Sequence, residues 1–332
     1  MNKKLQSQDL TKNRFKISGL FDSNTFVMVC VLAVVIVIFS FLNPNYLTQG
    51  NFINILVAAT TIGLLAIGQT YLIIAGHIDL SAGTSAALSG VLTAYILREF
   101  ALNWPTAVLI ALIIAAVVGI INSVLVNVFN LQPFIATLAM ASVCRGFAFI
   151  LSDGRSISLQ DQGLIALGTG SVFGIPNPVI IMFVLFIVFG FILSRTVFGR
   201  SVYMIGGNRI AAKYAGLNPK KISTYLYIIS SLIAALAGIL SASRMHAALP
   251  GAVSGLEFDA ITAAILGGVA FTGGKGTMLG CFIGLLIMQS FNNGLTAVQV
   301  PAFWQVVAKG ALLIGALIFD YFRTERLKRS AR

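Results

Sequence analysis

Long runs without a single charged residue divide this chain. Asp, Glu, Lys and Arg are all missing from five stretches: residues 24–76, 100–144, 162–194, 222–243 and 276–308. Turn residues and isolated charges divide these stretches further. The pattern predicts ten helices, at residues 24–42, 52–75, 80–97, 104–128, 133–151, 177–194, 223–243, 258–272, 277–297 and 302–322.

The composition makes these helices membrane spans. The chain has 332 residues, of which 58% are hydrophobic and only 10% are charged. An average soluble domain is about 25% charged, so a water-soluble globule is excluded. A membrane β-barrel is also excluded, since its strands alternate polar and apolar residues over about ten positions. We therefore expect an all-α membrane protein with about ten transmembrane helices.

The charge distribution orients the chain. Lys and Arg total 22 against 10 Asp and Glu, a net charge of +12. Most basic residues lie in residues 1–23, in the loop 195–221 and in residues 323–332. Basic segments stay in the cytoplasm, so we expect both termini to be cytoplasmic, flanking a transmembrane domain at residues 24–322. We interpret the excess of basic residues as a signal that sets the membrane topology and as a source of attraction to anionic lipid. We expect no nucleic acid as a partner.

A weak internal repeat relates the two halves, at about 52–152 and 223–322. In each half an Asp opens a helix of small residues, a helix with Asn residues follows, and a Pro then opens a helix with a basic residue before Gly. The corresponding residues are Asp79, Asn122, Pro133 and Arg145 in one half, and Asp259, Asn292, Asn293, Pro301 and Lys309 in the other. The predicted topology puts Asp79 at the inner face and Asp259 at the outer face. We therefore expect an inverted repeat of two four-helix halves plus two extra helices, as in alternating-access transporters.

The loop 195–221 is the longest predicted cytoplasmic connection. Asn208 is a good N-cap and Gly216 a good residue after a helix end, so a two-turn helix is expected between them. Such a helix has Ile210, Ala211, Tyr214 and Ala215 near one face. Two interpretations stay open: the helix binds a groove of another protein, or it lies on lipid headgroups.

Four polar residues at helix ends or inside helices have competing interpretations. Asp79 caps the helix at 80–97, lines a gate, or does both, and His77 either contacts solvent or contacts solute. Arg145 and Lys309 lie within membrane helices, where a cation normally needs a partner. They either line a solute path or lock the bundle by pairing with backbone carbonyls or with Glu257 or Asp259.

The sequence lacks the usual signs of an enzyme. The turn 273–277 resembles a phosphate-binding loop, but Val269 and Gly276 replace the required Gly and Ser/Thr. No nucleophile–base pair or metal cluster is recognisable. The ten acidic residues lie at or near predicted membrane edges, which disfavours the alternative of an ion-coupled secondary carrier with a central carboxylate. Composition and topology thus indicate a polytopic transporter with a partner-facing inner loop.

Four segments together resemble one known family. They are Gly76–Gly83, the loop with Ile205-Gly-Gly-Asn208 and Ala215-Gly-Leu, the stretch from Asp259 to Thr277, and the stretch from Asn292 to Asp320. The chain resembles the permease subunit of ABC importers for simple sugars, the ribose, xylose, galactose and arabinose group. The family commonly has Gly-Gly where this chain has Gly76-His77, which leaves the sugar and the role of His77 open.

The resemblance implies a permease in a bacterial cytoplasmic membrane. It implies a monosaccharide delivered by an external binding protein, and a second copy or a paralogous permease. ATP and Mg²⁺ bind a partner ATPase, so this chain needs no cofactor and is no enzyme itself. The loop 195–221 then carries the ATPase-coupling helix, with candidate residues Asn208, Arg209, Ala211, Ala212, Tyr214, Ala215 and Gly216. Candidates for the translocation path or gate are His77, Asp79, Asn122, Arg145, Asp259, Asn292, Asn293 and Lys309.

Overall fold

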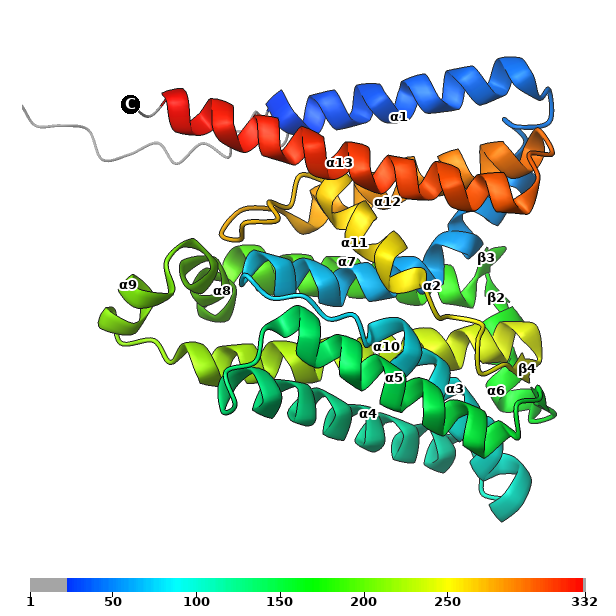
Figure 1. The fold of residues 1–332 in the computed structure, drawn as a ribbon. Coiled ribbons are helices and arrows are strands. Elements are labelled where there is room, and N and C mark those ends of the chain that lie inside the picture. The colour runs from blue at the N-terminus through cyan, green and yellow to red at the C-terminus, as the bar shows by residue number, and fades with distance from the viewer. Residues whose placement is uncertain (1–22, 331–332) are drawn as a thin grey trace, which may run out of the picture.

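The structure, a computed structural model, describes residues 23–330 as a long bundle of helices (Figure 1). Its helices are α1 (Ser23–Leu42), α2 (Gln49–Ile74), α3 (Ala82–Phe100), α4 (Trp104–Asn127), α5 (Pro133–Ser152), α6 (Gln162–Thr169), α7 (Asn177–Arg195), α8 (Val197–Gly207), α9 (Arg209–Tyr214), α10 (Pro219–Met245), α11 (Leu256–Leu266), α12 (Met278–Ala297) and α13 (Ala302–Ser330). Two small antiparallel ladders join β1 (Ile157–Ser158) to β4 (Ala247–Ala248), and β2 (Ser171–Val172) to β3 (Ile175–Pro176).

Eight helices in the described part of the chain are long and apolar enough to cross a membrane: α1, α2, α4, α5, α7, α10, α12 and α13. The expectation of an all-α membrane protein is confirmed. Each of the ten expected helices has a counterpart, but α3 and α11 are not among the eight. α3 contains many Ala, Gly, Ser and Thr residues, and α11 has only 11 residues. At 1.5 Å per residue, α11 covers about half of a 30 Å bilayer.

The expected helix at 258–272 was too long, and the reason is local. α11 ends at Leu266 because Gly268 adopts a φ of +78°, which favours glycine. The N–H of Gly268 then donates to the carbonyl of Ile265 at 2.8 Å, and the N–H of Val269 to that of Ala264 at 3.0 Å. These two bonds form a Schellman motif, which satisfies the last carbonyls of a helix. Gly267 and Gly268 thus end the helix at a point where the apolar sequence alone predicted that it would continue.

The centre of the bundle is the crossing of α2 and α10. α10 packs on α2, α3 and α4, while α2 packs also on α7, α11 and α12. Small residues permit this closeness. A Cβ on Gly238 of α10 would overlap the backbone carbonyl of Ala86 in α3, and a Cβ on Gly90 would lie 2.8 Å from the carbonyl of Gly238. Backbone-to-backbone contact of this kind fixes α3 against α10.

The helix contacts in the first half of the predicted repeat have counterparts in the second half. α4 packs on α10 as α12 packs on α2, and α3 packs on α5 as α11 packs on α13. α1 lies at the edge, against α12. The inverted repeat and the domain boundaries stay predictions, and most of the expected N-terminal segment 1–23 lies outside the described residues. The expected tail 323–332 begins as a continuation of α13, which runs to Ser330.

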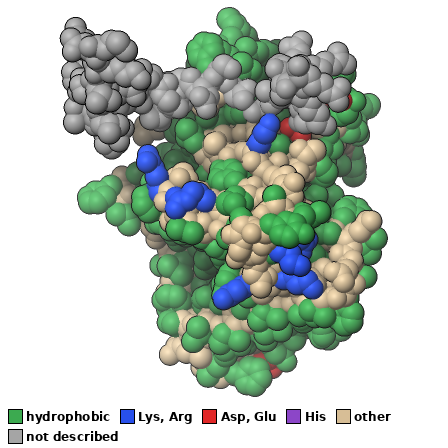
Figure 2. All heavy atoms as spheres, turned by 90° about the vertical axis from the view of Figure 1, so that its left-hand side faces the viewer, with side chains coloured by type: hydrophobic (Ala, Val, Ile, Leu, Met, Phe, Trp, Pro, Cys, Tyr) green, Lys and Arg blue, Asp and Glu red, His purple; other side chains and the backbone are tan. Residues whose placement is uncertain are grey.

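The two ends of the bundle differ in charge and structure. One end carries α8 and α9, and Lys and Arg side chains gather on it (Figure 2). The other end carries α6 and both strand pairs (Figure 1). Hydropathy did not predict α6 or α8, because both are short. The basic end is the one that the charge rule assigns to the cytoplasm, and this orientation also stays a prediction.

Replacing Gly238 with Val should damage the bundle, because the added atoms overlap the α3 backbone. We expect the free energy of unfolding to fall by about 1–3 kcal/mol or more, seen as a lower thermal unfolding midpoint of the purified protein in detergent. Gly315→Val in α13 is the matched control, since a Cβ there has no neighbour within 4 Å. Equal midpoints for the two variants would contradict the proposed packing.

Candidate functional site

α9 forms as the sequence predicted. The Asn208 side chain accepts hydrogen bonds from the N–H groups of Ile210 and Ala211, at 3.0 and 2.9 Å. Gly216 has a φ of +85°, and a Schellman motif links it and Leu217 back to the helix. A helix of six residues cannot be stable by propensity alone. Its capping at both ends explains how it persists at the surface.

α9 exposes the face that the sequence predicted, but one of the candidate coupling residues is buried. Ile210 is 70% exposed and Tyr214 is 87% exposed, and Ala211 and Ala215 are exposed as well. Ala212 is only 1% exposed. The inclusion of Ala212 in a partner-facing surface is therefore wrong: its methyl group packs into the chain itself. The remaining face offers a large apolar and aromatic surface beside two small residues.

α8 connects α9 to the core. Thr196 caps α8 by accepting from the N–H of Gly199 at 3.1 Å. The Tyr203 hydroxyl donates to the carbonyl of Gly276 at 2.7 Å, and the N–H of Gly274 donates to the carbonyl of Ile74, the last residue of α2, at 2.8 Å. The turn 273–277, which has no phosphate-loop pattern, thus joins α8 to the end of α2.

The connection between α2 and α3 is non-helical backbone held inside the protein. α2 ends in a third Schellman motif, at Gly76 and His77. Later amides of the connection donate to side chains. The N–H of Leu80 donates to Thr137 Oγ1 at 3.0 Å, and that of Ser81 to Asp79 Oδ1 at 2.8 Å. The backbone carbonyl of Asp79 accepts from the Gln69 amide.

Asp79 is a buried structural acceptor in this arrangement. It is 0% exposed, and its carboxylate accepts from Ser81 rather than from the first turn of α3, which begins at Ala82. The expectation that Asp79 caps this helix is therefore wrong: the N-cap is Ser81, and Asp79 binds the N-cap residue instead of the helix. Asn122, also 0% exposed, donates to Ser81 Oγ at 2.8 Å. The hydroxyl of Ser230 in α10 lies 3.5 Å from Asp79 Oδ2. This network joins α2, α4, α5 and α10 around the start of α3.

His77 lies between this network and the basic end. Its ring packs edge-on against Tyr227, and Nδ1 lies 3.4 Å from the Tyr227 hydroxyl. Burial, reinforced by the positive charge of Arg209, lowers the pKa of His77 to about 4. The ring is therefore neutral at pH 7. His77 also lines a cavity of about 1040 Å³ between α9 and the α4–α5 loop.

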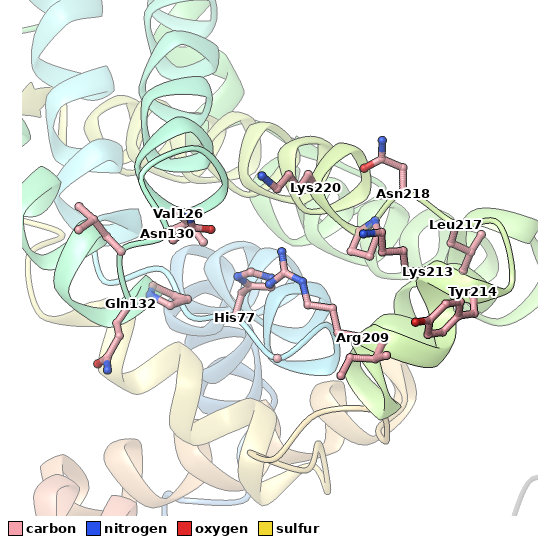
Figure 3. Close-up of a pocket in the computed structure, with 15 residues that line it drawn as sticks. His77, Val126, Asn130, Gln132, Arg209, Lys213, Tyr214, Leu217, Asn218 and Lys220 are labelled. Atoms are coloured by element: carbon pink, nitrogen blue, oxygen red, sulfur yellow. The ribbon is translucent and has the colours of Figure 1, made fainter.

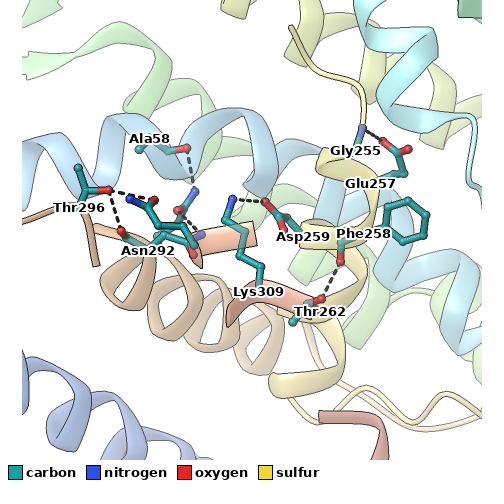
Figure 4. A network of polar contacts seen from close by, with 11 residues as sticks. Ala58, Gly255, Glu257, Phe258, Asp259, Thr262, Asn292, Thr296 and Lys309 are labelled. Carbon is teal, nitrogen blue, oxygen red and sulfur yellow. Dashed lines mark hydrogen bonds and ion pairs between the residues drawn. The ribbon is translucent and has the colours of Figure 1, made fainter. Parts of the chain in front are cut away.

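The second group of candidates lies around α11 and α12 (Figure 4). Lys309 of α13 forms an ion pair with Asp259 of α11, Nζ to Oδ2, at 3.0 Å. This pair was one of the alternatives that the sequence left open. Asn293 and Asn51 exchange amide hydrogen bonds at 2.9 Å, which ties α12 to the start of α2. Asn292 donates to Gln289 at 3.4 Å.

Arg145 is different from Lys309. It is exposed on α5, and neither of the two ion pairs found among the described residues includes it. Twelve residues separate it from Pro133, so it lies about 18 Å along a helix of membrane-spanning length. Glu257 is close enough for the Arg145 charge to act on it, but the carboxylate accepts instead from the N–H of Gly255 at 2.9 Å. Arg145 therefore faces outward at mid-span.

Sequence reasoning missed several residues that build the network. Gln69, Thr137, Tyr227 and Ser230 were not singled out. One signal was available, since Gln69 is a strongly polar residue inside a charge-free apolar run and needs a buried partner. The other three have no distinctive pattern, because Ser, Thr and Tyr are common in membrane helices.

Several known transport permeases are similar to this chain. Residues 51–317 match a family described as the permease component of a branched-chain amino acid transport system. The ribose import permease protein of Bacillus subtilis is 38% identical over 87% of this chain and 90% of its own length. The L-arabinose ABC transporter permease protein of Azospirillum brasilense is 36% identical over 88% and 87%. A probable ABC transporter permease protein of Escherichia coli is 34% identical over 93% of each. No solved structure matches.

The chain belongs to this permease family. The match includes both α9 and the α2–α3 connection, so the resemblance seen in the motifs is confirmed. Apolar helices and relatives together establish a multi-pass membrane permease.

The ion pair between α11 and α13 allows a stability test. Lys309→Met should lower the free energy of unfolding by roughly 1–3 kcal/mol, because Asp259 keeps a largely buried charge without its partner. The loss is smaller than for a fully buried pair, since a third of the Lys309 side chain is exposed. Thermal unfolding in detergent gives the measurement. Adding Asp259→Asn should restore part of the loss, whereas an unchanged midpoint for Lys309→Met alone would contradict the role of the pair.

Proposed function

We propose that this permease is the membrane subunit of an ATP-driven importer that carries a monosaccharide into the bacterial cytoplasm. The observation that carries the proposal is the similarity, over nearly the whole chain, to permeases named for ribose and L-arabinose. The family description names branched-chain amino acids, but the relatives of 34–38% identity that name a solute name sugars.

The proposed energy source is a partner ATPase that binds ATP and Mg²⁺ and docks on α9. The exposed Ile210 and Tyr214 suit such docking, since aromatic and aliphatic side chains dominate interface energies. Ala211 and Ala215 leave room for close approach. Because α8 and the turn 273–277 connect α9 to the end of α2, motion of α9 has a mechanical route to the α2–α3 connection.

A second permease, identical or paralogous, is proposed to cover the face with α5, α11 and α13, which faces the viewer in Figure 1. Arg145 is exposed on it, and exposing a cation to lipid at mid-span costs about 3 kcal/mol. Gly146 and Gly310 also have no neighbour within 4 Å of a Cβ position. A glycine inside a helix lowers helix stability by about 1 kcal/mol relative to Ala. The two glycines have a purpose if another backbone or a solute passes close to them. The solute path then runs between the two permeases, and the external sugar-binding protein docks at the end with α6.

Transport should require ATP and should not require an ion gradient. Proteoliposomes holding the complete complex, with ATP enclosed on the ATPase side, should accumulate labelled monosaccharide in the presence of the binding protein. A protonophore should leave the initial rate nearly unchanged. Uptake that follows an imposed ion gradient without ATP would instead favour the alternative, a secondary carrier.

Docking on α9 can be tested without disturbing the bundle. Ala215→Arg adds a charge to a residue that is exposed in the free chain, so folding should be nearly normal. In the complex the same charge is desolvated without a partner, which costs several kcal/mol. We expect the purified variant permease to lose its ATPase on size-exclusion chromatography and to lose transport. Lys221→Ala, a neighbouring exposed position, is the control. Normal transport by an intact Ala215→Arg complex would rule out docking at this face.

A further inference from the structure

The cavity between α9 and the α4–α5 loop gathers positive charge without an internal partner (Figure 3). Its walls are the α2–α3 connection, the end of α4 and the loop that follows, α9, and the start of α10. Arg209, Lys213 and Lys220 line it. Among the described residues that line the cavity there is no carboxylate, and none of these three cations forms an ion pair.

The charge rule explains basic residues at this end of the bundle but not their convergence on one hollow. Three cations around one cavity repel each other, so an anion bound there relieves that repulsion. Arg209 extends toward His77 at the inner wall (Figure 3). The hydrogen bond that Arg209 makes among the described residues is a long one, 3.5 Å from Nη2 to Asn127 Oδ1. The guanidinium therefore has donors left for a ligand, and its fork geometry suits phosphate.

The size and remaining polar groups narrow the class of ligand. The volume of about 1040 Å³ is at the upper end of the range for small-molecule sites, so a bare inorganic ion leaves most of it unfilled. Asn130, Gln132 and Asn218 also line the cavity. The Asn218 Oδ1 accepts from the N–H of Lys221 and the Asn130 Nδ2 donates to the carbonyl of Val128, so the other polar atom of each of these two amides is left for a ligand. Amides bind hydroxyl groups well. The lining as a whole suits a molecule with a phosphate group and several hydroxyls.

We propose that this cavity is a regulatory site for a phosphate monoester of monosaccharide size, and that its occupancy slows transport. This rests on the proposed function for the direction of the effect. α9 is one wall of the cavity and is also the proposed ATPase contact. A ligand that binds this arrangement better than others shifts the population toward it. Since coupling requires α9 to move, the bound ligand opposes turnover. Phosphorylation of an imported monosaccharide would generate this class of ligand on the cytoplasmic side.

The binding test uses the intact permease–ATPase complex in phosphatidylcholine nanodiscs, with labelled ribose 5-phosphate as probe in equilibrium dialysis. We expect saturable binding that inorganic phosphate displaces and unphosphorylated ribose does not. Lys213→Gln should weaken binding roughly tenfold, the loss expected for one charge-assisted hydrogen bond, while Lys213→Arg should keep most of it. Lys221→Gln is the matched control, a neighbouring exposed lysine outside the cavity. Equal losses in Lys213→Gln and Lys221→Gln would overturn the site.

A second arm distinguishes a soluble ligand from a lipid headgroup, which offers the same phosphate chemistry. Nanodiscs containing phosphatidylglycerol should bind the probe as well as phosphatidylcholine discs do. If phosphatidylglycerol instead weakens probe binding in the native complex but not in Lys213→Gln, the cavity is an anion site whose occupant is a lipid. That result would overturn the sugar phosphate as its ligand. Failure of both the probe and the lipid to bind in a Lys213-dependent way would overturn the proposal.

The regulatory effect is measured as uptake by proteoliposomes with the probe on the cytoplasmic side, relative to each variant's own rate without it. We expect the probe to slow the native complex severalfold and Lys213→Gln much less. Equal slowing in both would contradict regulation through this cavity. Dialysis needs no transport, so a complex that binds the probe but shows no ATP-dependent uptake would count against the proposed function alone.

Discussion

The α2–α3 connection depends on hydrogen bonds that its backbone makes inside the protein. A bilayer offers no water to non-helical backbone, so such a segment must be enclosed and hydrogen-bonded internally. Gly76 ends α2, Thr137 and Asp79 take the amides of Leu80 and Ser81, and Gln69 binds the Asp79 carbonyl. These partners come from α2 and α5, while α4 and α10 close the network. The non-helical connection between α2 and α3 therefore needs the close packing of these helices as much as the apolar core does.

The same constraint explains how charges are distributed along the spans. Lys309 lies within an apolar helix and has Asp259 as a partner, so the pair joins α13 to α11. Arg145 has no such partner in the described part of the chain, and its exposure supports the proposed contact with a second permease. One cation thus stabilises the subunit, and the other marks the surface where we propose that the second permease lies. Both conclusions follow from the cost of an unpaired charge in hydrocarbon.

The sequence predicted what local rules determine and missed what tertiary contacts determine. Long apolar runs located the spans, and Asn208 with Gly216 located α9 to within a residue. The Gly267-Gly268 pair was visible but was read as part of a helix, because hydropathy contains no backbone dihedral. Ala212 was included among the coupling residues, because the sequence does not show which side of α9 the rest of the chain covers. Tyr227 lies 150 residues from His77 in the sequence, and only the crossing of α10 with α2 brings them together.

The position of His77 connects these observations. Its backbone amide closes the end of α2, and its ring contacts Tyr227 of α10 and lines the cavity beside α9. A neutral ring adds no charge to the cavity, so the field there comes from Arg209, Lys213 and Lys220. An arginine or lysine at this position would add a fourth cation at the inner wall, next to Arg209, and a glycine would remove the contact with α10. His77 thus provides contact between the helix break and the basic end of the bundle without altering the charge on which the cavity depends.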